Sequence, residues 1–435
     1  MNTPDTTPGI KPADLRGILK YVPRFQNQTF VLALDGFVVA DDNFPNLLVD
    51  AAVLRSLGIR LVIVHGIAWQ LAALAQHRSV TPSDSDGSGV TDAPTLALAI
   101  EAAAQVSQDI LGGLTRNGLK CAITNAVSAH PTGVIRGTDQ LHTGRVDRID
   151  RDFLNQLLSA AIIPVIQPLG YSPDGAPLRI NSDLLAAELA EALGASKIIY
   201  LTPRPGLEID GKIQRDISVE TLRGLLAGSP SKIPAPLLTK ITHALRAIET
   251  GTPRVHIVDG RAHDGLLNEV FSTEGVGTMI YASDYQQIRR ATKADARLIH
   301  NLTRGSVRRE ELLHRTLQAI EKNIDRYYLF ETDDTVIACA ALTPFEEDPT
   351  LREIGSLYVQ PYHQNRGIGR KMVDYAIHKA REAGAKRLVA LSTQSPTFFT
   401  SVMNFAETTP DILPPSRRRQ LDETGRNSKV LLKLL

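Results

Sequence analysis

Cysteine is scarce in this chain, and its scarcity excludes two kinds of stabilised domain. Cys121 and Cys339 are the only two cysteines among 435 residues, and they are far apart in the sequence. A disulfide framework requires several cysteines, and a zinc cluster requires closely spaced ligands. We therefore expect no bound metal and a reducing, cytoplasmic environment.

A charge excess of one sign and long apolar runs are also missing. The 48 basic residues are balanced by 47 acidic ones, a net charge of +1, which argues against a dedicated nucleic-acid surface. No apolar run approaches the roughly 20 residues that cross a bilayer. Residues 1–9 lack the pattern of a signal peptide. We expect no nucleic-acid partner, no membrane insertion and, from the length, two or three domains.

The first two thirds of the chain alternate short apolar segments with helical ones. The predicted strands are rich in β-branched residues and bounded by turn residues: 30–34, 60–65, 161–166, 197–201 and 254–258. The predicted helices include 45–57, 93–114 and 182–193. Apolar strands separated by helices predict an α/β sandwich with a mostly parallel sheet covered on both faces. Residues 83–89, Ser-Asp-Ser-Asp-Gly-Ser-Gly, are expected to form a mobile loop.

The most informative motif lies in the last third, where a strand leads into a glycine-rich turn. Leu357, Tyr358 and Val359 favour a strand, and Pro361 ends it. Gly367 and Gly369 then free the backbone just before a periodic helix at 372–383. A helix start with exposed amides binds phosphate well, although an ordinary strand-to-helix turn has the same pattern.

The Gln-x-x-Gly-x-Gly pattern from Gln364 resembles the pyrophosphate loop of the GNAT N-acetyltransferases. The segment that begins at Tyr285, the strand pair at 327–332 and 335–342, and the strand at 386–392 fit the same family. The resemblance implies an α/β domain that uses acetyl-coenzyme A as a co-substrate and holds no permanent cofactor. The residues that it assigns to the coenzyme are Leu357, Tyr358, Val359, Gln364, Asn365, Arg366, Gly367, Ile368, Gly369 and Arg370.

The GNAT resemblance also implies catalytic roles. Glu353 is placed as the general base that takes a proton from an amine, directly or through a water, because only a neutral amine attacks a thioester. The amides of Leu357–Val359 would stabilise the oxyanion. Ser392 is placed as the acid for the leaving thiolate, or as no more than a hydrogen-bond donor to its sulfur.

Two arginines are expected to hold a dicarboxylate substrate, because arginine forks match carboxylates. The resemblance assigns this role to Arg315 and Arg426, which match arginines that bind glutamate in similar synthases, with Ser356, Phe398 and Phe399 lining the same cleft. Solvent exposure is the alternative for each arginine. Residues 417–419, Arg-Arg-Arg, are expected in a solvated loop or beside the ribose phosphate of the coenzyme.

The first two thirds resemble the amino-acid kinase fold, in particular N-acetylglutamate kinase. The resemblance rests on Val62-Ile-Val-His-Gly, on Asn181-Ser-Asp and on Lys197-Ile-Ile-Tyr-Leu-Thr. Such kinases hold the transferring phosphate with a lysine and paired glycines after the first strand, where this chain has Ala33-Leu-Asp-Gly-Phe. Without the cationic clamp and the amide cradle we expect a kinase fold that lacks kinase activity.

Residues 264–280 resemble the segment that marks arginine-sensitive N-acetylglutamate kinases and synthases. The implied L-arginine site comprises Glu269, Phe271, Gly275, Gly277 and Thr278, whereas the alternative is a surface helix end with a glycine cap. Residues 13–25 have an apolar face and resemble the N-terminal helix that links such proteins into rings, or pack on their own subunit. A homo-oligomer, a hexamer by analogy, is thus expected.

The order of these parts resembles bacterial N-acetylglutamate synthase over nearly the whole chain. We expect an N-terminal segment at 1–26, an inactive, arginine-binding kinase-like domain at 27–282 and a GNAT domain at 286–435. The implied reaction is acetyl transfer from acetyl-coenzyme A to the α-amine of L-glutamate, the first step of arginine biosynthesis, inhibited by L-arginine. The alternatives are a GNAT enzyme for another amine, an N-acetylglutamate kinase with an accessory domain, and an arginine-binding regulatory protein.

Overall fold

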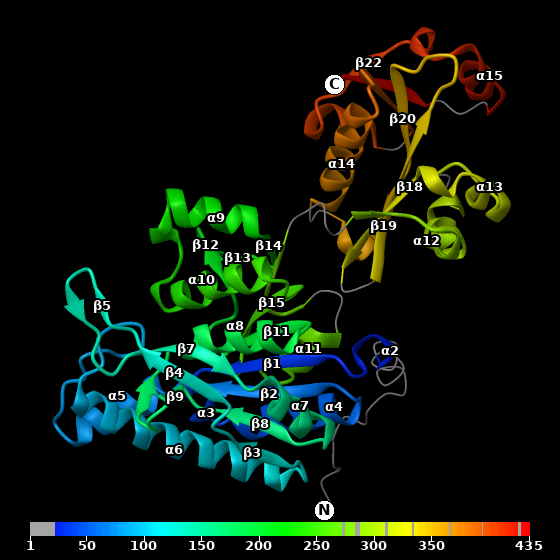
Figure 1. The fold of residues 1–435 in the computed structure, drawn as a ribbon. Helices are drawn as coiled ribbons and strands as arrows, with labels where there is room; N and C mark the ends of the chain where they lie inside the picture. Colours follow the sequence, from blue (N-terminus) through cyan, green and yellow to red (C-terminus); the bar gives the residue numbers. More distant parts are fainter. Residues whose placement is uncertain are drawn as a thin grey trace, which may run out of the picture. The chain divides into compact units, whose positions relative to one another are not determined.

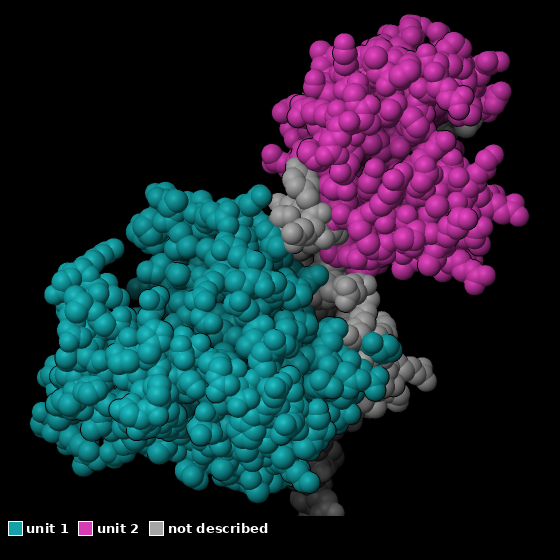
Figure 2. Space-filling model, in the orientation of Figure 1, with its two compact units in different colours: residues 1–282 teal, residues 283–435 magenta. Residues whose placement is uncertain are grey.

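A computed structural model describes most of the chain as two compact units. The described residues are 22–271, 275–282, 288–308, 312–332, 335–364, 367–393, 395–424 and 428–435. Unit 1 extends to Ala282 and unit 2 runs from Ser283 to Leu435 (Figure 2). Each unit has its own hydrophobic core and its own main sheet.

Unit 1 is built on an eight-stranded sheet whose order is β14-β16-β15-β11-β1-β2-β8-β3. All pairs are parallel except β15 with β16. The strands are β1 (Thr29–Leu34), β2 (Arg60–His65), β3 (Cys121–Ile123), β8 (Ile163–Ile166), β11 (Lys197–Thr202), β14 (Asp216–Ser218), β15 (Arg254–Asp259) and β16 (Thr278–Tyr281).

Helices cover both faces of this sheet, as Figure 1 shows. Along β1, Val31 and Ala33 enter one core, whereas Phe30, Leu32 and Leu34 enter the other. The first core includes residues of α7 (Arg151–Ser159), α8 (Ser182–Leu193), α9 (Val219–Gly228) and α10 (Ala235–Glu249). The second includes residues of α2 (Val22–Phe25), α3 (Gly36–Val39), α4 (Phe44–Ser56), α5 (Ala68–His77), α6 (Ala93–Arg116) and α11 (Gly265–Phe271). The predicted mostly parallel sheet with two covered faces is confirmed.

Smaller elements complete unit 1. A four-stranded sheet has the order β10-β9-β4-β7 and comprises β4 (Val127–Pro131), β7 (Gly144–Ile149), β9 (Leu169–Tyr171) and β10 (Pro177–Arg179). Two short hairpins pair β5 (Val134–Ile135) with β6 (Thr138–Asp139) and β12 (Glu208–Ile209) with β13 (Lys212–Ile213). A 3-10 turn, η1, spans Pro230–Lys232.

Unit 2 is a seven-stranded sheet of order β17-β18-β19-β20-β21-β23-β22. Its strands are β17 (Ile288–Arg290), β18 (Tyr327–Thr332), β19 (Thr335–Pro344), β20 (Leu351–Val359), β21 (Arg387–Ser392), β22 (Ala406–Thr408) and β23 (Lys429–Leu434). Helix α14 (Ile368–Glu382) packs on one face, and α12 (Ala296–Arg308) and α13 (Leu317–Lys322) pack on the other (Figure 1). The remaining elements are α15 (Pro415–Thr424), a π-helical turn at Phe398–Val402 and 3-10 turns at Lys293–Asp295, Ile324–Arg326, Pro361–His363 and Pro410–Ile412.

Strand β20 changes character halfway along its length. It pairs in parallel with β21 only from Leu351 to Ile354, although both strands continue. Near the same point its register with β19 shifts, and Ser356 adopts a φ of 49°. A bulge of this kind bends a strand and changes the side to which the following residues point. Ile354 and Leu357, three positions apart, consequently contact the same core.

Candidate active site and the kinase-like cleft

The general base predicted from sequence lies in the first half of β20 and is already ion-paired. Glu353 accepts hydrogen bonds from Arg417, 2.6 Å from Nε to Oε2 and 2.9 Å from Nη2 to Oε1. The Glu353 side chain is 9% exposed and that of Arg417 is 19% exposed. The carboxylate raises the pKa of Arg417, chiefly through these hydrogen bonds. The expectation that Arg417 lies in a solvated loop is therefore wrong, because α15 carries it onto Glu353.

A cavity of about 410 Å³ opens beside this pair. It is lined by Leu313, Arg315, Asn323, Arg326, Tyr327, Ala341, Thr343, Phe345, Glu353, Ser416, Arg417, Gln420 and Glu423. The Nε of Arg315 is buried and has no hydrogen-bond partner among the described residues. The structure thus brings Arg315, Glu353 and Arg417 to one cavity, and sequence reasoning missed Arg326 and the role of Arg417.

The other residues predicted to line the substrate cleft lie elsewhere in unit 2. Ser356 forms the bulge of β20. Phe399 is buried in the core against Phe398 and Phe405, with ring centroids 5.2 and 5.3 Å apart. None of Ser356, Phe398 and Phe399 lines the cavity around Glu353. Arg426 falls outside the described residues.

The glycine-rich turn leads directly into α14. Gly367 is the N-cap of the helix, with φ 77° in the left-handed region that favours glycine. Gln364 donates from Nε2 to the carbonyl of Val359 at 3.1 Å and so ties the turn to the end of β20. A Cβ on Gly369 would lie 3.4 Å from Phe398 Cζ, so the glycine keeps the helix start close to this ring. Asn365 and Arg366 are outside the described residues, and Ile368 and Arg370 lie in the first turn.

Strands β20 and β21 no longer pair beyond Ile354, and we call the opening between them the split. The remaining predicted residues lie on these two strands. Leu357, Tyr358 and Val359 follow the bulge, where β20 no longer pairs with β21. Ser392 ends β21, and its Oγ accepts a hydrogen bond from the amide of Ser395 at 3.2 Å. The split is thus bounded by backbone amides on one strand and by a hydroxyl at the end of the other.

In unit 1, the turn that follows β1 holds an ion cluster. Lys240 Nζ lies 2.7 Å from Asp35 Oδ1 and 3.0 Å from Asp183 Oδ1. Thr239 donates to the other oxygen of Asp183 at 2.8 Å. A carboxylate therefore follows β1 directly and is paired with a buried lysine.

Glu269, expected to bind arginine, is buried at the end of α11. It accepts a hydrogen bond from His256 Nδ1 at 2.6 Å and from the amides of Val276 and Gly277 at 2.7 and 2.8 Å. Burial disfavours its charged form, but these hydrogen bonds and the charge of His256 lower its pKa below the ordinary value. Phe271, at the end of α11, contacts Phe25 of α2 with ring centroids 6.3 Å apart. Gly275 approaches the Glu269 carboxylate closely, and Thr278 accepts from the amide of Leu207.

Comparisons with known proteins agree with this architecture. The amino acid kinase family matches residues 28–259, and the acetyltransferase (GNAT) family matches residues 293–403. An amino-acid acetyltransferase of Pseudomonas putida is 32% identical over 431 residues, which cover 97% of this chain and 98% of the relative. The chain belongs to the amino-acid acetyltransferase family. A second member of this family, from Pseudomonas aeruginosa, is 33% identical over the same share of both chains.

Solved structures place the fold in the same family. N-acetylglutamate synthase from Neisseria gonorrhoeae, complexed with coenzyme A and L-arginine, matches with a TM-score of 0.81 at 31% identity over 97% of this chain and 99% of that one. The same protein complexed with coenzyme A and N-acetyl-glutamate matches with a TM-score of 0.63 at 32% identity and the same coverage. Among the described residues of this family member, no helix has the length and apolar character that crossing a membrane requires.

Proposed function

We propose that this protein transfers the acetyl group of acetyl-coenzyme A to the α-amine of L-glutamate. The observation that carries the proposal is the cavity that Arg315 lines together with the ion pair of the buried Glu353 carboxylate and Arg417. Guanidinium forks bind carboxylates in a bidentate manner, and glutamate brings two. The Neisseria gonorrhoeae relative was crystallised with coenzyme A and N-acetyl-glutamate, which supports the same donor and product here.

The coenzyme is assigned to the start of α14. Its diphosphate would accept hydrogen bonds from the amides that follow Gly367, at the positive end of the helix dipole. Gln364, Ile368, Gly369 and Arg370 are proposed to lie beside it, and the roles of Asn365 and Arg366 remain predictions. The thioester would then lie in the split between β20 and β21, beside the amides of Leu357–Val359.

Glutamate binding and base activation are coupled in this mechanism. In the structure the fork of Arg417 is occupied by Glu353. A glutamate carboxylate that enters the cavity competes for this fork and releases Glu353 to take the proton of the α-ammonium, directly or through a water. A protonated amine has no lone pair for attack, so this step must come first.

The acetyl transfer then follows in two steps. The neutral amine attacks the thioester carbonyl, and the oxyanion is stabilised by the amides of Leu357–Val359. The carbon–sulfur bond then breaks, and the attacking nitrogen, which became cationic on attack, releases its second proton. The thiolate takes up one proton and leaves as coenzyme A, with Ser392 as the hydroxyl assigned to its sulfur. The products are N-acetyl-L-glutamate and free coenzyme A.

Unit 1 is proposed to be regulatory. The Asp35 carboxylate on Lys240 argues against phosphoryl transfer, which relies on cationic charge around the phosphate. The Glu269 cluster is the proposed L-arginine site. Glu269 accepts hydrogen bonds from the amides of Val276 and Gly277, which lead into β16, and a guanidinium bound at its carboxylate would alter these hydrogen bonds. Inhibition by arginine would be feedback by the product of the pathway that N-acetylglutamate enters. The ring-forming role of residues 13–25 stays a prediction, since only 22–25 of this segment are described.

One assay tests the reaction, the acceptor and the regulation together. The release of free thiol from acetyl-coenzyme A is followed with glutamate, with other amino acids, and with glutamate plus arginine. We expect release that depends on glutamate and decreases with arginine. Release that is independent of glutamate, or that is faster with another amine, contradicts the acceptor assignment. Phosphorylation of N-acetylglutamate by ATP would contradict the inactive kinase unit.

A further inference from the structure

The kinase-like cleft of unit 1 remains an open cavity although its phosphate machinery is gone. Its volume is about 510 Å³, within the usual range for small-molecule sites. It lies beyond the carboxyl ends of the neighbouring parallel strands β1 and β2, with Asp35 following β1 and Gly66 following β2. Open α/β sheets bind their ligands at this edge.

The two cations in its wall are already neutralised. Lys240 lies between Asp35 and Asp183 at 2.7 and 3.0 Å. Arg179 is 1% exposed, lies 3.5 Å from Asp84, and donates to the carbonyls of Asp84 and Ser85 at 3.0 and 2.7 Å. These contacts also tie Asp84 and Ser85 to the cavity wall, and the mobility of residues 83–89 stays a prediction. An entering anion would have to displace a carboxylate from either cation.

Two backbone donors at the cavity are occupied as well. The amides of Asp183 and Leu184, at the start of α8, both donate to Asn181 Oδ1 at 3.0 Å. This cap removes two donors that a phosphate would use at a helix start. The start of α8 is therefore not available to an anion in the cavity.

Carboxylates outnumber cations along the lining. Asp35, Asp86 and Asp183 face Lys240 and Arg179, and the Arg179 charge is shared with Asp84. The Asp35 side chain is 28% exposed and open to the cavity. Burial raises the pKa of Asp35, and the neighbouring Asp183 adds to this rise, whereas Lys240 opposes it. Among the described residues, no group of three or more His, Cys, Asp or Glu is placed to hold a metal ion.

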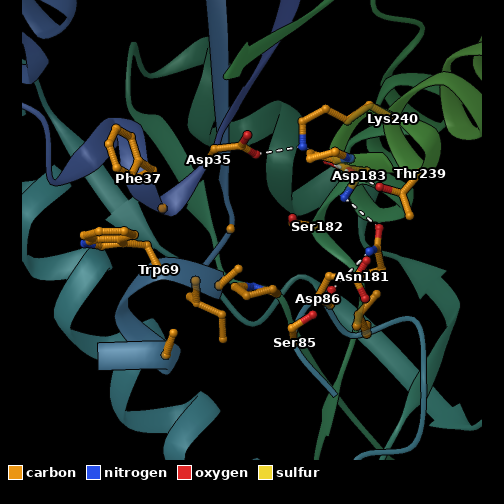
Figure 3. A pocket seen from close by; sticks show the side chains of 18 of the residues that line it. Asp35, Phe37, Trp69, Ser85, Asp86, Asn181, Ser182, Asp183, Thr239 and Lys240 are labelled. Carbon is orange, nitrogen blue, oxygen red and sulfur yellow. Dashed lines mark hydrogen bonds and ion pairs between the residues drawn. The ribbon is translucent and has the colours of Figure 1, made fainter. Parts of the chain in front are cut away.

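Two aromatic rings form the opposite wall. Phe37 and Trp69 meet edge to face with ring centroids 4.8 Å apart, across the cavity from Lys240 and Asp183 (Figure 3). Trp69 is 51% exposed, which is unusual for so large a side chain. Tryptophan faces attract cations and apolar groups. The cavity thus has an acidic end and an aromatic end.

We propose that this cavity binds a small organic cation, with its ammonium or guanidinium head at Asp35 and Asp86 and a short apolar body against Phe37 and Trp69. The loss of the kinase lysine and the gain of Asp35 would then have converted an anion site into a cation site. This site is separate from the Glu269 cluster and from the cavity around Glu353.

The chain offers a direct probe, because Trp69 is its only tryptophan. Trp69 emission of the full-length protein is titrated with agmatine, and in parallel with pyrophosphate as an anionic probe. We expect a saturable change with agmatine and none with pyrophosphate. Asp35→Asn and Asp86→Asn should each weaken agmatine binding about tenfold, the effect of losing about 1.4 kcal/mol of binding free energy. Asp86→Asn keeps the Lys240 cluster intact, so its effect is independent of any damage to that cluster.

The matched control is Asp147→Asn, which removes a 63% exposed aspartate of unit 1 that does not line the cavity. Its agmatine affinity should stay within about twofold of the parent. Saturable binding of pyrophosphate, no response to either probe, or unchanged agmatine affinity in both cavity variants would overturn the proposal. The emission readout does not depend on turnover, so its result is independent of the proposed acetyl transfer.

Discussion

Arg417 allows the sharpest test of the proposed acetyltransferase site. Its bidentate contact with Glu353 joins two largely buried side chains. Loss of one partner of a buried ion pair leaves an unpaired charge and typically costs about 3 to 5 kcal/mol. If the same fork binds a glutamate carboxylate, Arg417→Gln should lose about 3 kcal/mol of transition-state binding, or about 150-fold in kcat/KM for glutamate. Most of this loss should appear in KM for glutamate, and KM for acetyl-coenzyme A should change little.

Two further variants separate binding from structural support. Arg417→Lys keeps the charge but loses the fork, so its defect should be about tenfold. Arg418→Gln is the matched control, because the 50% exposed Arg418 pairs, among the described residues, with the exposed Asp411 alone, and such surface pairs contribute little. Thiol release measures the kinetics, and thermal melting checks the fold. An unchanged KM for glutamate in Arg417→Gln refutes the reasoning, and faster turnover at unchanged KM would mean that Arg417 only masks the base.

Three other predictions concern separate parts of the chain. Glu353→Gln should lower kcat about 100- to 10,000-fold in the thiol-release assay while coenzyme A binding, measured by calorimetry, persists; a smaller loss contradicts its role as the base. Gly367→Ala should raise KM for acetyl-coenzyme A and leave that for glutamate unchanged, because a left-handed φ strains any residue with a Cβ; equal effects on both substrates would argue against a coenzyme loop. Burial lowers the pKa of His65 to about 4, below the usual 6.5 of the unfolded chain, so the contribution of this group to the stability of unit 1 should fall by up to about 3 kcal/mol as the pH falls from 6.5 to 4. Burial raises the pKa of Asp50 to about 6 and acts in the opposite direction over the same range, so the His65 contribution is measured as the difference in denaturant unfolding between the parent and His65→Gln; an equal pH dependence in both contradicts it.

The local sequence pattern predicted the helices and strands of the fold well. The strand at 60–65 and the helix at 182–193 begin and end at the predicted residues, because a β-branched run and a capped apolar helix are decided locally. The helix predicted at 372–383 begins earlier, at Ile368. Glycines usually indicate a loop, but here Gly367 caps the helix and Gly369 lies in its first turn, where Phe398 is close.

Long-range contacts could not be predicted from the sequence, for a physical reason. Arg417 reaches Glu353 from 64 positions away, and nothing in a run of three arginines tells which one will be buried. The acidic, serine-rich loop at 83–89 has the composition of a mobile segment, yet Arg179 holds its carbonyls from 94 and 95 positions away. The bulge at Ser356 was equally hidden, because a serine there gives no sign of a positive φ.

The bulge in β20 makes the number of residues in this strand structurally important. Successive side chains of a strand point to alternate faces of the sheet. The extra residue at Ser356 shifts this alternation by one position between Glu353 and Leu357–Val359. Many substitutions at position 356 would keep the number of residues in β20. Deletion of one residue would instead turn Leu357 and Val359 away from the core under α14, and it would also displace the glycine-rich turn that Gln364 ties to Val359. We therefore expect relatives to differ at this position by exchange of a residue and not by its loss.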